Sequence, residues 1–162
     1  MCGIFSFFGK TDKNLELFSN KVSYRGPDSS ELTMVSDEAI LGFHRLSIMD
    51  TSSLGNQPMS LKSNESVTLI CNGEIYNYRE IIDSYGFKTE SKSDSEVILH
   101  LYNEVPFEDI PKILDGVYAF VIYDNSKDLV MAGRDPFGVR PMFIGSDKNG
   151  GIGIASEAKS LV

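Results

Sequence analysis

The order in which strands and helices follow one another is the feature that most constrains the fold of this chain. Apolar and β-branched runs predict strands towards both ends, whereas two amphipathic helices are predicted in the middle, one ending at Gly86 and one beginning at Ser93. This order favours an α+β fold with largely antiparallel sheets over alternating βαβ units. The predicted strands cover residues 3–9, 40–43, 67–71, 117–123, 129–132, 142–145 and 152–155.

Local signals place the ends of several of these elements. Leu15, Phe18 and Val22 share one side of a short helix near the start of the chain. The sequence at residues 93–96, Ser-Asp-Ser-Glu, matches a capping box at the start of a later helix. The strand at 67–71 is expected to end abruptly where the sequence becomes Asn-Gly-Glu.

Composition limits the classes of protein to which the chain can belong. Its 162 residues, 41% of them hydrophobic, fit one domain with an ordinary core. No apolar run approaches the roughly 20 residues of a membrane helix, and no signal peptide is recognisable. The net charge of −8 argues against nucleic-acid binding. The two cysteines, Cys2 and Cys71, form neither a disulfide framework nor a zinc pattern, so we expect a cytoplasmic protein without a metal site.

A cysteine directly follows the initiator methionine. If Met1 is removed, Cys2 carries both a thiol and a free α-amine, whose pKa of about 7.7–8.0 suits a general base near neutral pH. A nucleophile paired with its own terminal amine is a known catalytic arrangement. The alternative is that Cys2 is a small buried residue of the first strand.

A reaction at an amide carbonyl also needs hydrogen-bond donors for the oxyanion that forms. The side-chain amide of Asn72 and the backbone N–H of Gly73 are candidates, at the end of a predicted buried strand. The alternative is a plain hairpin turn, for which Asn-Gly is the favoured sequence. The segment that follows has a helical pattern, which weakens the hairpin interpretation.

An amino-acid substrate would need partners for its two charged groups. Arg45, at the end of a predicted strand, has the planar fork that suits a carboxylate. Glu74 and Asp94 are carboxylates available for an ammonium group. Taken singly, Glu74 also fits a solvated turn, and Asp94 fits a charge placed in the first turn of a helix.

Seven motifs in one order give the chain a specific resemblance. It resembles the class II glutamine amidotransferases, which act through an N-terminal nucleophile, and within them the glutaminase domain of asparagine synthetase. The resemblance spans nearly the whole chain. The motifs are Met1-Cys2-Gly3-Ile4, Arg25-Gly26-Pro27-Asp28, His44-Arg45-Leu46-Ser47-Ile48, Asn72-Gly73-Glu74-Ile75-Tyr76-Asn77, Asp94-x-Glu96, Leu114-Asp115-Gly116 and Gly133-Arg134-Asp135-x-x-Gly138.

The resemblance implies a fold and a reaction. The fold is the N-terminal-nucleophile hydrolase sandwich, with four αββα layers and two mainly antiparallel sheets. The reaction is hydrolysis of L-glutamine to glutamate and ammonia through a cysteinyl thioester, with the ammonia used for asparagine biosynthesis. No cofactor is implied for this half-reaction, whereas ATP and Mg would belong to a separate synthetase domain.

The resemblance also assigns roles to individual residues. Cys2 would be the nucleophile and its amine the base, while Asn72 and the Gly73 N–H would form the oxyanion hole. Arg25 and Asp28 would shape the site. The residues implied for binding glutamine are Arg45, Leu46, Ser47, Ile48, Met49, Asn72, Gly73, Glu74 and Asp94.

The chain departs from the complete synthetase pattern in one respect. It contains no Ser-Gly-Gly-x-Asp-Ser loop of an ATP-pyrophosphatase domain, so we expect residues 1–162 to be a glutaminase domain, truncated at its C-terminus, whose partner would be a synthetase domain or subunit. We also expect Met1 to be removed. The alternative to an active glutaminase is a catalytically silent module that binds glutamine or another protein.

Overall fold

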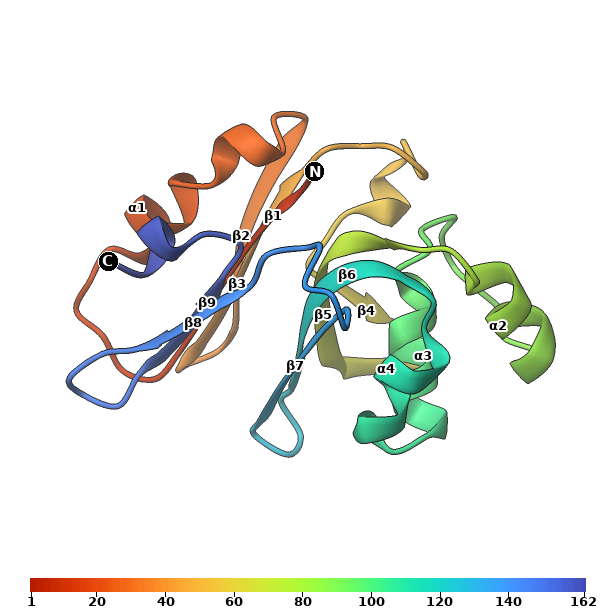
Figure 1. The fold of residues 1–162 in the computed structure, drawn as a ribbon. Helices are drawn as coiled ribbons and strands as arrows, with labels where there is room; N and C mark the ends of the chain where they lie inside the picture. The colour runs from red at the N-terminus through yellow and green to blue at the C-terminus, as the bar shows by residue number, and fades with distance from the viewer.

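Two antiparallel sheets face each other in the computed structural model, which describes residues 1–162 (Figure 1). The first sheet has the strand order β2-β3-β1-β9-β8 and the second has the order β4-β5-β6-β7. The first consists of β1 (Gly3–Phe8), β2 (Ser29–Ser36), β3 (Ala39–Arg45), β8 (Phe143–Ser146) and β9 (Ile152–Ala155). The second consists of β4 (Met59–Leu61), β5 (Asn64–Ile75), β6 (Gly116–Asp124) and β7 (Leu129–Arg134).

Helices cover the outer face of each sheet (Figure 1). The first sheet carries α1 (Leu15–Asn20) and the 3-10 turns η1 (Ser23–Arg25) and η4 (Ala158–Leu161). The second carries α2 (Tyr78–Tyr85), α3 (Glu96–Glu104), η3 (Phe107–Asp109) and α4 (Ile110–Ile113), while η2 (Ser53–Gly55) lies in the loop before β4. The predicted four-layer αββα sandwich is therefore confirmed.

The layers follow from strands that are apolar on both faces. On β1, Ile4 belongs to the core between the sheets, whereas Phe5 and Phe7 pack on the opposite face with residues of α1 and η4. On β5, Ile70 faces the space between the sheets, and Leu69 faces the core beneath the helices of the second sheet. Successive side chains of a strand point to opposite faces, so both strands are buried on two sides.

The predicted end of the strand at 67–71 is wrong. β5 continues through Asn72-Gly73-Glu74 to Ile75, because β6 pairs with it along nine positions, from Val67↔Asp124 to Ile75↔Gly116. The absence of a side chain at Gly73 permits this pairing, since a Cβ there would lie 2.6 Å from the carbonyl oxygen of Val117. Tertiary pairing thus overrides the turn signal of Asn-Gly.

The predicted capping box is also wrong. The helix begins at Glu96, and Ser93 does not cap it with its side chain. The Glu96 carboxylate instead accepts hydrogen bonds from the backbone N–H groups of Glu90 (2.6 Å) and Ser91 (2.7 Å), so it organises the preceding loop. No strands were predicted at β2 and β4, because β2 is largely polar with no fully buried residue and β4 has only three residues.

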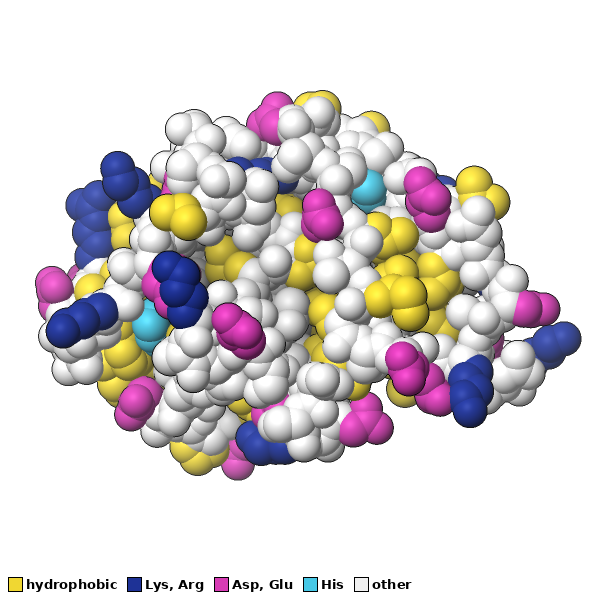
Figure 2. Space-filling model, turned by 180° about the vertical axis from the view of Figure 1, so that it is seen from behind, with side chains coloured by type: hydrophobic (Ala, Val, Ile, Leu, Met, Phe, Trp, Pro, Cys, Tyr) yellow, Lys and Arg dark blue, Asp and Glu magenta, His cyan; other side chains and the backbone are white.

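The surface fits the acidic composition. On the face shown in Figure 2, acidic side chains are scattered among the basic ones, and no basic patch covers the face. None of the helices has the length and apolar character of a membrane span.

Candidate active site

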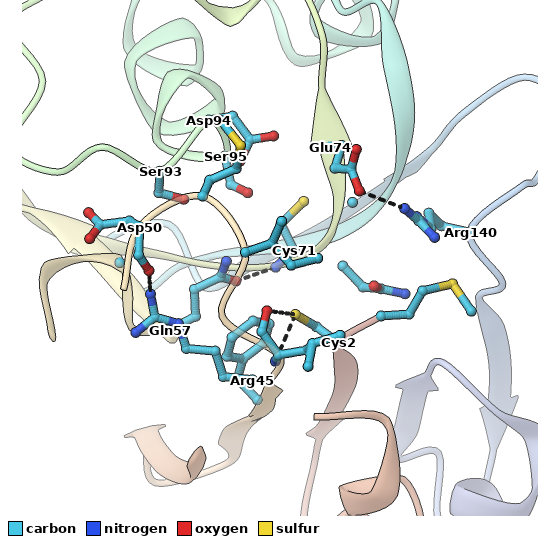
Figure 3. A pocket seen from close by; sticks show the side chains of 18 residues that line it. Cys2, Arg45, Asp50, Gln57, Cys71, Glu74, Ser93, Asp94, Ser95 and Arg140 are labelled. Carbon is cyan, nitrogen blue, oxygen red and sulfur yellow. Dashed lines mark hydrogen bonds and ion pairs between the residues drawn. The ribbon is translucent and has the colours of Figure 1, made fainter. Parts of the chain in front are cut away.

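One cavity lies where the core between the sheets ends, beside the start of β1, the end of β3 and the last residues of β5 (Figure 3). Strand alternation explains its polar lining. Ile4, Phe43 and Ile70 face the core between the sheets, so Cys2, Arg45 and Asn72, each two residues further along the same strand or its extension, face the same space. Glu74 continues this series on β5, and all four polar side chains line the cavity.

The position of Cys2 is set by the pairing of β1 with β3, which places Gly3 opposite His44. The Leu46 N–H donates to Cys2 Sγ at 3.4 Å, and the thiol lies 3.6 Å from the Leu46 carbonyl. Gly3 allows the chain to pass close to η1, since a Cβ there would lie 2.8 Å from the Val22 carbonyl oxygen.

The surroundings of Cys2 disfavour ionisation of its thiol in this form of the chain. Burial raises the pKa of Cys2, while the Leu46 hydrogen bond, the nearby amino terminus and the positive charges of Arg45 and Arg140 act in the opposite direction. Met1 is half exposed, with 51% of its surface accessible to solvent, so the bond that joins it to Cys2 lies near the surface. Its removal would transfer the terminal amine to Cys2 itself.

Asn72 is the most unusual polar group of the cavity. The residue is 1% exposed, and its Nδ2 is buried without a hydrogen-bond partner. Leaving a buried donor unpaired costs about 1–3 kcal/mol, so such groups are rare in folded proteins. Nδ2 is enclosed in this form of the chain, and the Asn72 side chain lines the same cavity as Cys2, so its amide is a candidate donor for an oxygen atom of a ligand.

A second donor lies next to Asn72 on the edge of β5. The N–H of Cys71 donates to Gln57 Oε1 (2.5 Å), and that of Ile75 donates to Asp94 Oδ2 (2.6 Å). Alternate residues of a strand direct their N–H groups to the same edge, so the N–H of Gly73 points there too. Tyr118 lies opposite Gly73 on β6, and both its backbone N–H and its carbonyl form hydrogen bonds with Asp135 rather than with Gly73. The Gly73 amide therefore faces the cavity, which it lines.

The Arg45 guanidinium is partly used by the loop that follows β3. Nη1 donates to the Ser52 carbonyl (2.8 Å) and to Asn56 Oδ1, and Nη2 donates to the Asp50 carbonyl. Three of five N–H groups are thus occupied, which leaves Nε–H and one Nη2–H without a partner. These two free donors make Arg45 a candidate for binding a carboxylate.

Two carboxylates lie on the other side of the cavity. Burial raises the pKa of Asp94, and the negative charge of Glu74 raises it further. Glu74 Oε1 forms an ion pair with Arg140 Nη2 at 3.3 Å, and Arg140 Nε is buried without a partner. Glu74 and Asp94 are the candidate partners for a cationic group at this end of the cavity, beside the guanidinium of Arg140.

The remaining predicted residues lie around the cavity. Leu46, Ile48 and Met49 line it, whereas Ser47, Arg25 and Asp28 do not. Asp28 Oδ2 accepts a hydrogen bond from the Ser47 N–H (2.7 Å), which fixes the loop after β3.

Arg25 braces the chain at Cys2. Its Nε donates to the Cys2 carbonyl (3.0 Å), and its Nη1 pairs with Glu157 at 2.9 Å. Burial acts to raise the pKa of Glu157, but hydrogen bonds from Tyr24, Arg25 and Lys159 outweigh it and lower this pKa to about 2.

Sequence reasoning missed several cavity residues. Gln57 and Arg140 line the cavity together with Asp50, Ser93 and Ser95. Gln57 lies in a loop rich in Ser, Gly, Asn and Pro, and such a composition indicates no binding role. Arg140 follows a recognised turn cluster at residues 133–138 by two positions, and its proximity to Glu74, 66 positions earlier, is a tertiary contact.

Comparisons with known proteins identify the family of the chain. Residues 1–162 match the family model described as glutamine amidotransferase domain. The chain is 40% identical over 167 residues to a protein named asparagine synthetase [glutamine-hydrolyzing] from Gallus gallus, and 39% identical over 166 residues to those from Bos taurus and Homo sapiens. Each match covers 100% of this chain and 29% of the relative, so the chain spans less than a third of these proteins.

Proposed function

Because the chain belongs to the family of glutamine amidotransferase domains, we propose that it hydrolyses L-glutamine to glutamate and ammonia at Cys2. The observation that carries the proposal is the unpaired, buried Nδ2 of Asn72 in the same cavity as the Cys2 thiol. Attack on an amide carbonyl requires a nucleophile and a hydrogen-bond donor positioned for the oxyanion that forms.

The reaction has two halves. After Met1 is removed, the α-amine of Cys2 takes the thiol proton, and the thiolate attacks the side-chain carboxamide carbon of glutamine. The oxyanion accepts hydrogen bonds from Asn72 Nδ2 and the Gly73 N–H, and collapse of the adduct breaks the C–N bond as the ammonium of Cys2 returns its proton to the leaving ammonia. Water, deprotonated by the amine, then cleaves the thioester to give glutamate and the free thiol.

The two ends of the cavity account for recognition of the amino acid. The free donors of Arg45, with backbone groups between Leu46 and Met49, bind the α-carboxylate. Glu74 and Asp94 bind the α-ammonium. The ion pair of Glu74 with Arg140 supports this role, because it holds the Glu74 carboxylate at the edge of the cavity.

We further propose that the ammonia serves asparagine biosynthesis, as the names of the relatives indicate. Their longer chains support a synthetase (ATP-pyrophosphatase) domain or subunit as the partner, and ATP and Mg would act there. The glutaminase steps above use only groups of this chain. A thiol nucleophile needs reducing conditions, which supports a cytoplasmic location.

One observation favours a second function. With Met1 attached, Cys2 has no α-amine of its own, and burial raises the pKa of its thiol. A chain that retained Met1 would be a silent module that binds glutamine.

Intact-mass measurement and a glutaminase assay decide between the two functions. We expect the purified protein to begin at Cys2 and to release glutamate from glutamine, while the Cys2→Ala variant releases none. Equal glutamate release by both proteins would refute the assignment of the nucleophile. A retained Met1 together with glutamine binding and no turnover would favour the silent module.

A further inference from the structure

We propose that Gln57 is an additional substrate-binding residue, whose side-chain N–H₂ donates a hydrogen bond to the α-carboxylate of the amino acid. This inference rests on the proposed function. It concerns a residue in the loop between η2 and β4, outside the motifs that indicate the family.

The orientation of the Gln57 amide is fixed by its partner. The side-chain atom bonded to Cys71 is held by a backbone N–H, which can only donate, so this atom is the oxygen Oε1, at 2.5 Å from the Cys71 nitrogen. The nitrogen Nε2 must then point away from the strand. Figure 3 shows this bond between Gln57 and the backbone of Cys71.

The nitrogen of this amide has no partner within the protein. Gln57 is 5% exposed, yet Nε2 forms no hydrogen bond and is not among the fully enclosed atoms without partners. Gln57 lines the cavity of Cys2, so Nε2 retains access to the space that a ligand would fill. Because Oε1 is bound and Nε2 is unpaired, the Gln57 amide has a free donor for an acceptor atom of a ligand.

The edge of β5 places Gln57 at the carboxylate end of the cavity. Three alternate N–H groups lie along this edge: Cys71 bonds to Gln57, Gly73 is free, and Ile75 bonds to Asp94. Residues two apart in a strand are separated by about 6.6 Å, so Gln57 and Asp94 flank the proposed oxyanion donor on opposite sides. Asp94 is at the end proposed for the ammonium, which leaves the opposite end for the carboxylate.

Arg45 lies at the same end as Gln57. The neighbouring Asn56 accepts a hydrogen bond from Arg45 Nη1, and a Cβ on Gly55 would lie 2.7 Å from Arg45 Nη2. One loop therefore both holds the guanidinium and presents the amide. A neutral donor beside a cation would bind a carboxylate without adding a second buried charge.

The Gln57→Glu variant tests this role with almost no change in shape. Its carboxylate can still accept the Cys71 N–H, but it replaces the donor that faces the ligand by a negative charge. We expect the KM for glutamine to rise by roughly tenfold to a hundredfold, because the hydrogen bond to the α-carboxylate is lost and the new carboxylate repels it. The kcat should change less than threefold, because the substituted group does not contact the reacting carbonyl. Gln57→Met, which adds no charge, should raise KM by roughly fivefold to tenfold.

Two controls separate substrate binding from structural damage. Asn149→Asp makes the same amide-to-acid change on an exposed turn residue and should leave KM unchanged. Glutamine whose α-carboxylate is replaced by a neutral amide should show less than a threefold difference between the parent and Gln57→Glu. Alkylation of Cys2 by iodoacetamide, which lacks a carboxylate, should proceed at the same rate in both proteins.

The outcomes distinguish the two proposals. If the parent hydrolyses glutamine and Gln57→Glu retains its KM within twofold, the role of Gln57 is wrong and the glutaminase proposal stands. An equal penalty for both substrates would assign Gln57 a structural role and also overturn the inference. If the parent has no turnover and glutamate does not protect Cys2 from iodoacetamide, both proposals fall.

Discussion

Replacing Asn72 with alanine separates what this side chain contributes to catalysis from what it contributes to stability. The side chain is buried and makes no hydrogen bond within the protein, so the substitution removes no internal bond. It also removes an unpaired buried donor, whose desolvation costs about 1–3 kcal/mol and offsets the packing that is lost. We therefore expect the free energy of unfolding to change by less than about 1 kcal/mol.

The effect on the reaction should be much larger. Loss of one oxyanion donor typically lowers kcat by about 100- to 1,000-fold, or about 2.7–4 kcal/mol of transition-state stabilisation. The KM for glutamine should change little, because the oxyanion exists only after the thiol has attacked. Steady-state glutamate release and urea unfolding, measured on the same preparations, give both quantities.

Asn77 provides the matched control. Its Nδ2 donates to the Ile113 carbonyl (2.9 Å) and its Oδ1 accepts the Asp115 N–H (2.9 Å). Asn77→Ala should therefore lower stability by about 2 kcal/mol, at about 1 kcal/mol per bond, and leave kcat unchanged. A kcat for Asn72→Ala within threefold of the parent would refute the assignment of Asn72 as an oxyanion donor.

Two further predictions concern charged groups. Arg45→Lys should raise the KM for glutamine by roughly tenfold, because one ammonium cannot replace the two parallel donors of the guanidinium, and an unchanged KM would mean that the carboxylate binds elsewhere. The pKa of Glu157 is lowered from 4.5 to about 2, so its ionised form stabilises the folded state fully above pH 4.5, and this contribution is lost as the pH falls towards 2. Glu157→Gln should accordingly flatten the dependence of the melting temperature on pH between these values, and an unchanged slope would contradict this linkage.

The sequence predicted the elements whose stability is local and missed those that depend on partners. The strand of Leu69 and Ile70 and the helix that ends at Gly86 were predicted because their apolar periodicity is strong. The continuation of β5 to Ile75 could not be predicted, since it depends on four pairs with β6, the last of which joins Ile75 to Gly116, 41 positions away. The edge strand β2 is largely polar, and its core-facing residues Leu32 and Val35 are only partly buried, so its apolar pattern is weak.

The candidate site divides in the same way. Cys2, Arg45, Asn72, Gly73, Glu74 and Asp94 were identified as candidates from residue chemistry and from motifs, and the cavity brings all six together. Gln57 and Arg140 were missed, because nothing in their own sequence neighbourhood reveals a Cys71 N–H or a Glu74 carboxylate. The role proposed for Gln57 depends on its hydrogen bond with the Cys71 N–H, which is a tertiary contact.

The Gly73 amide belongs to a paired strand rather than to a loop. Its direction is held by the pairing of β5 with β6 before any ligand arrives, so this part of the site is preorganised. Aldehyde analogues of glutamine, which form a tetrahedral adduct with a thiol, should then capture the enzyme without a slow closing step. Inhibitors of this kind would bind the Gly73 N–H, whose position depends on the pairing of β5 with β6 and not on the surrounding loops.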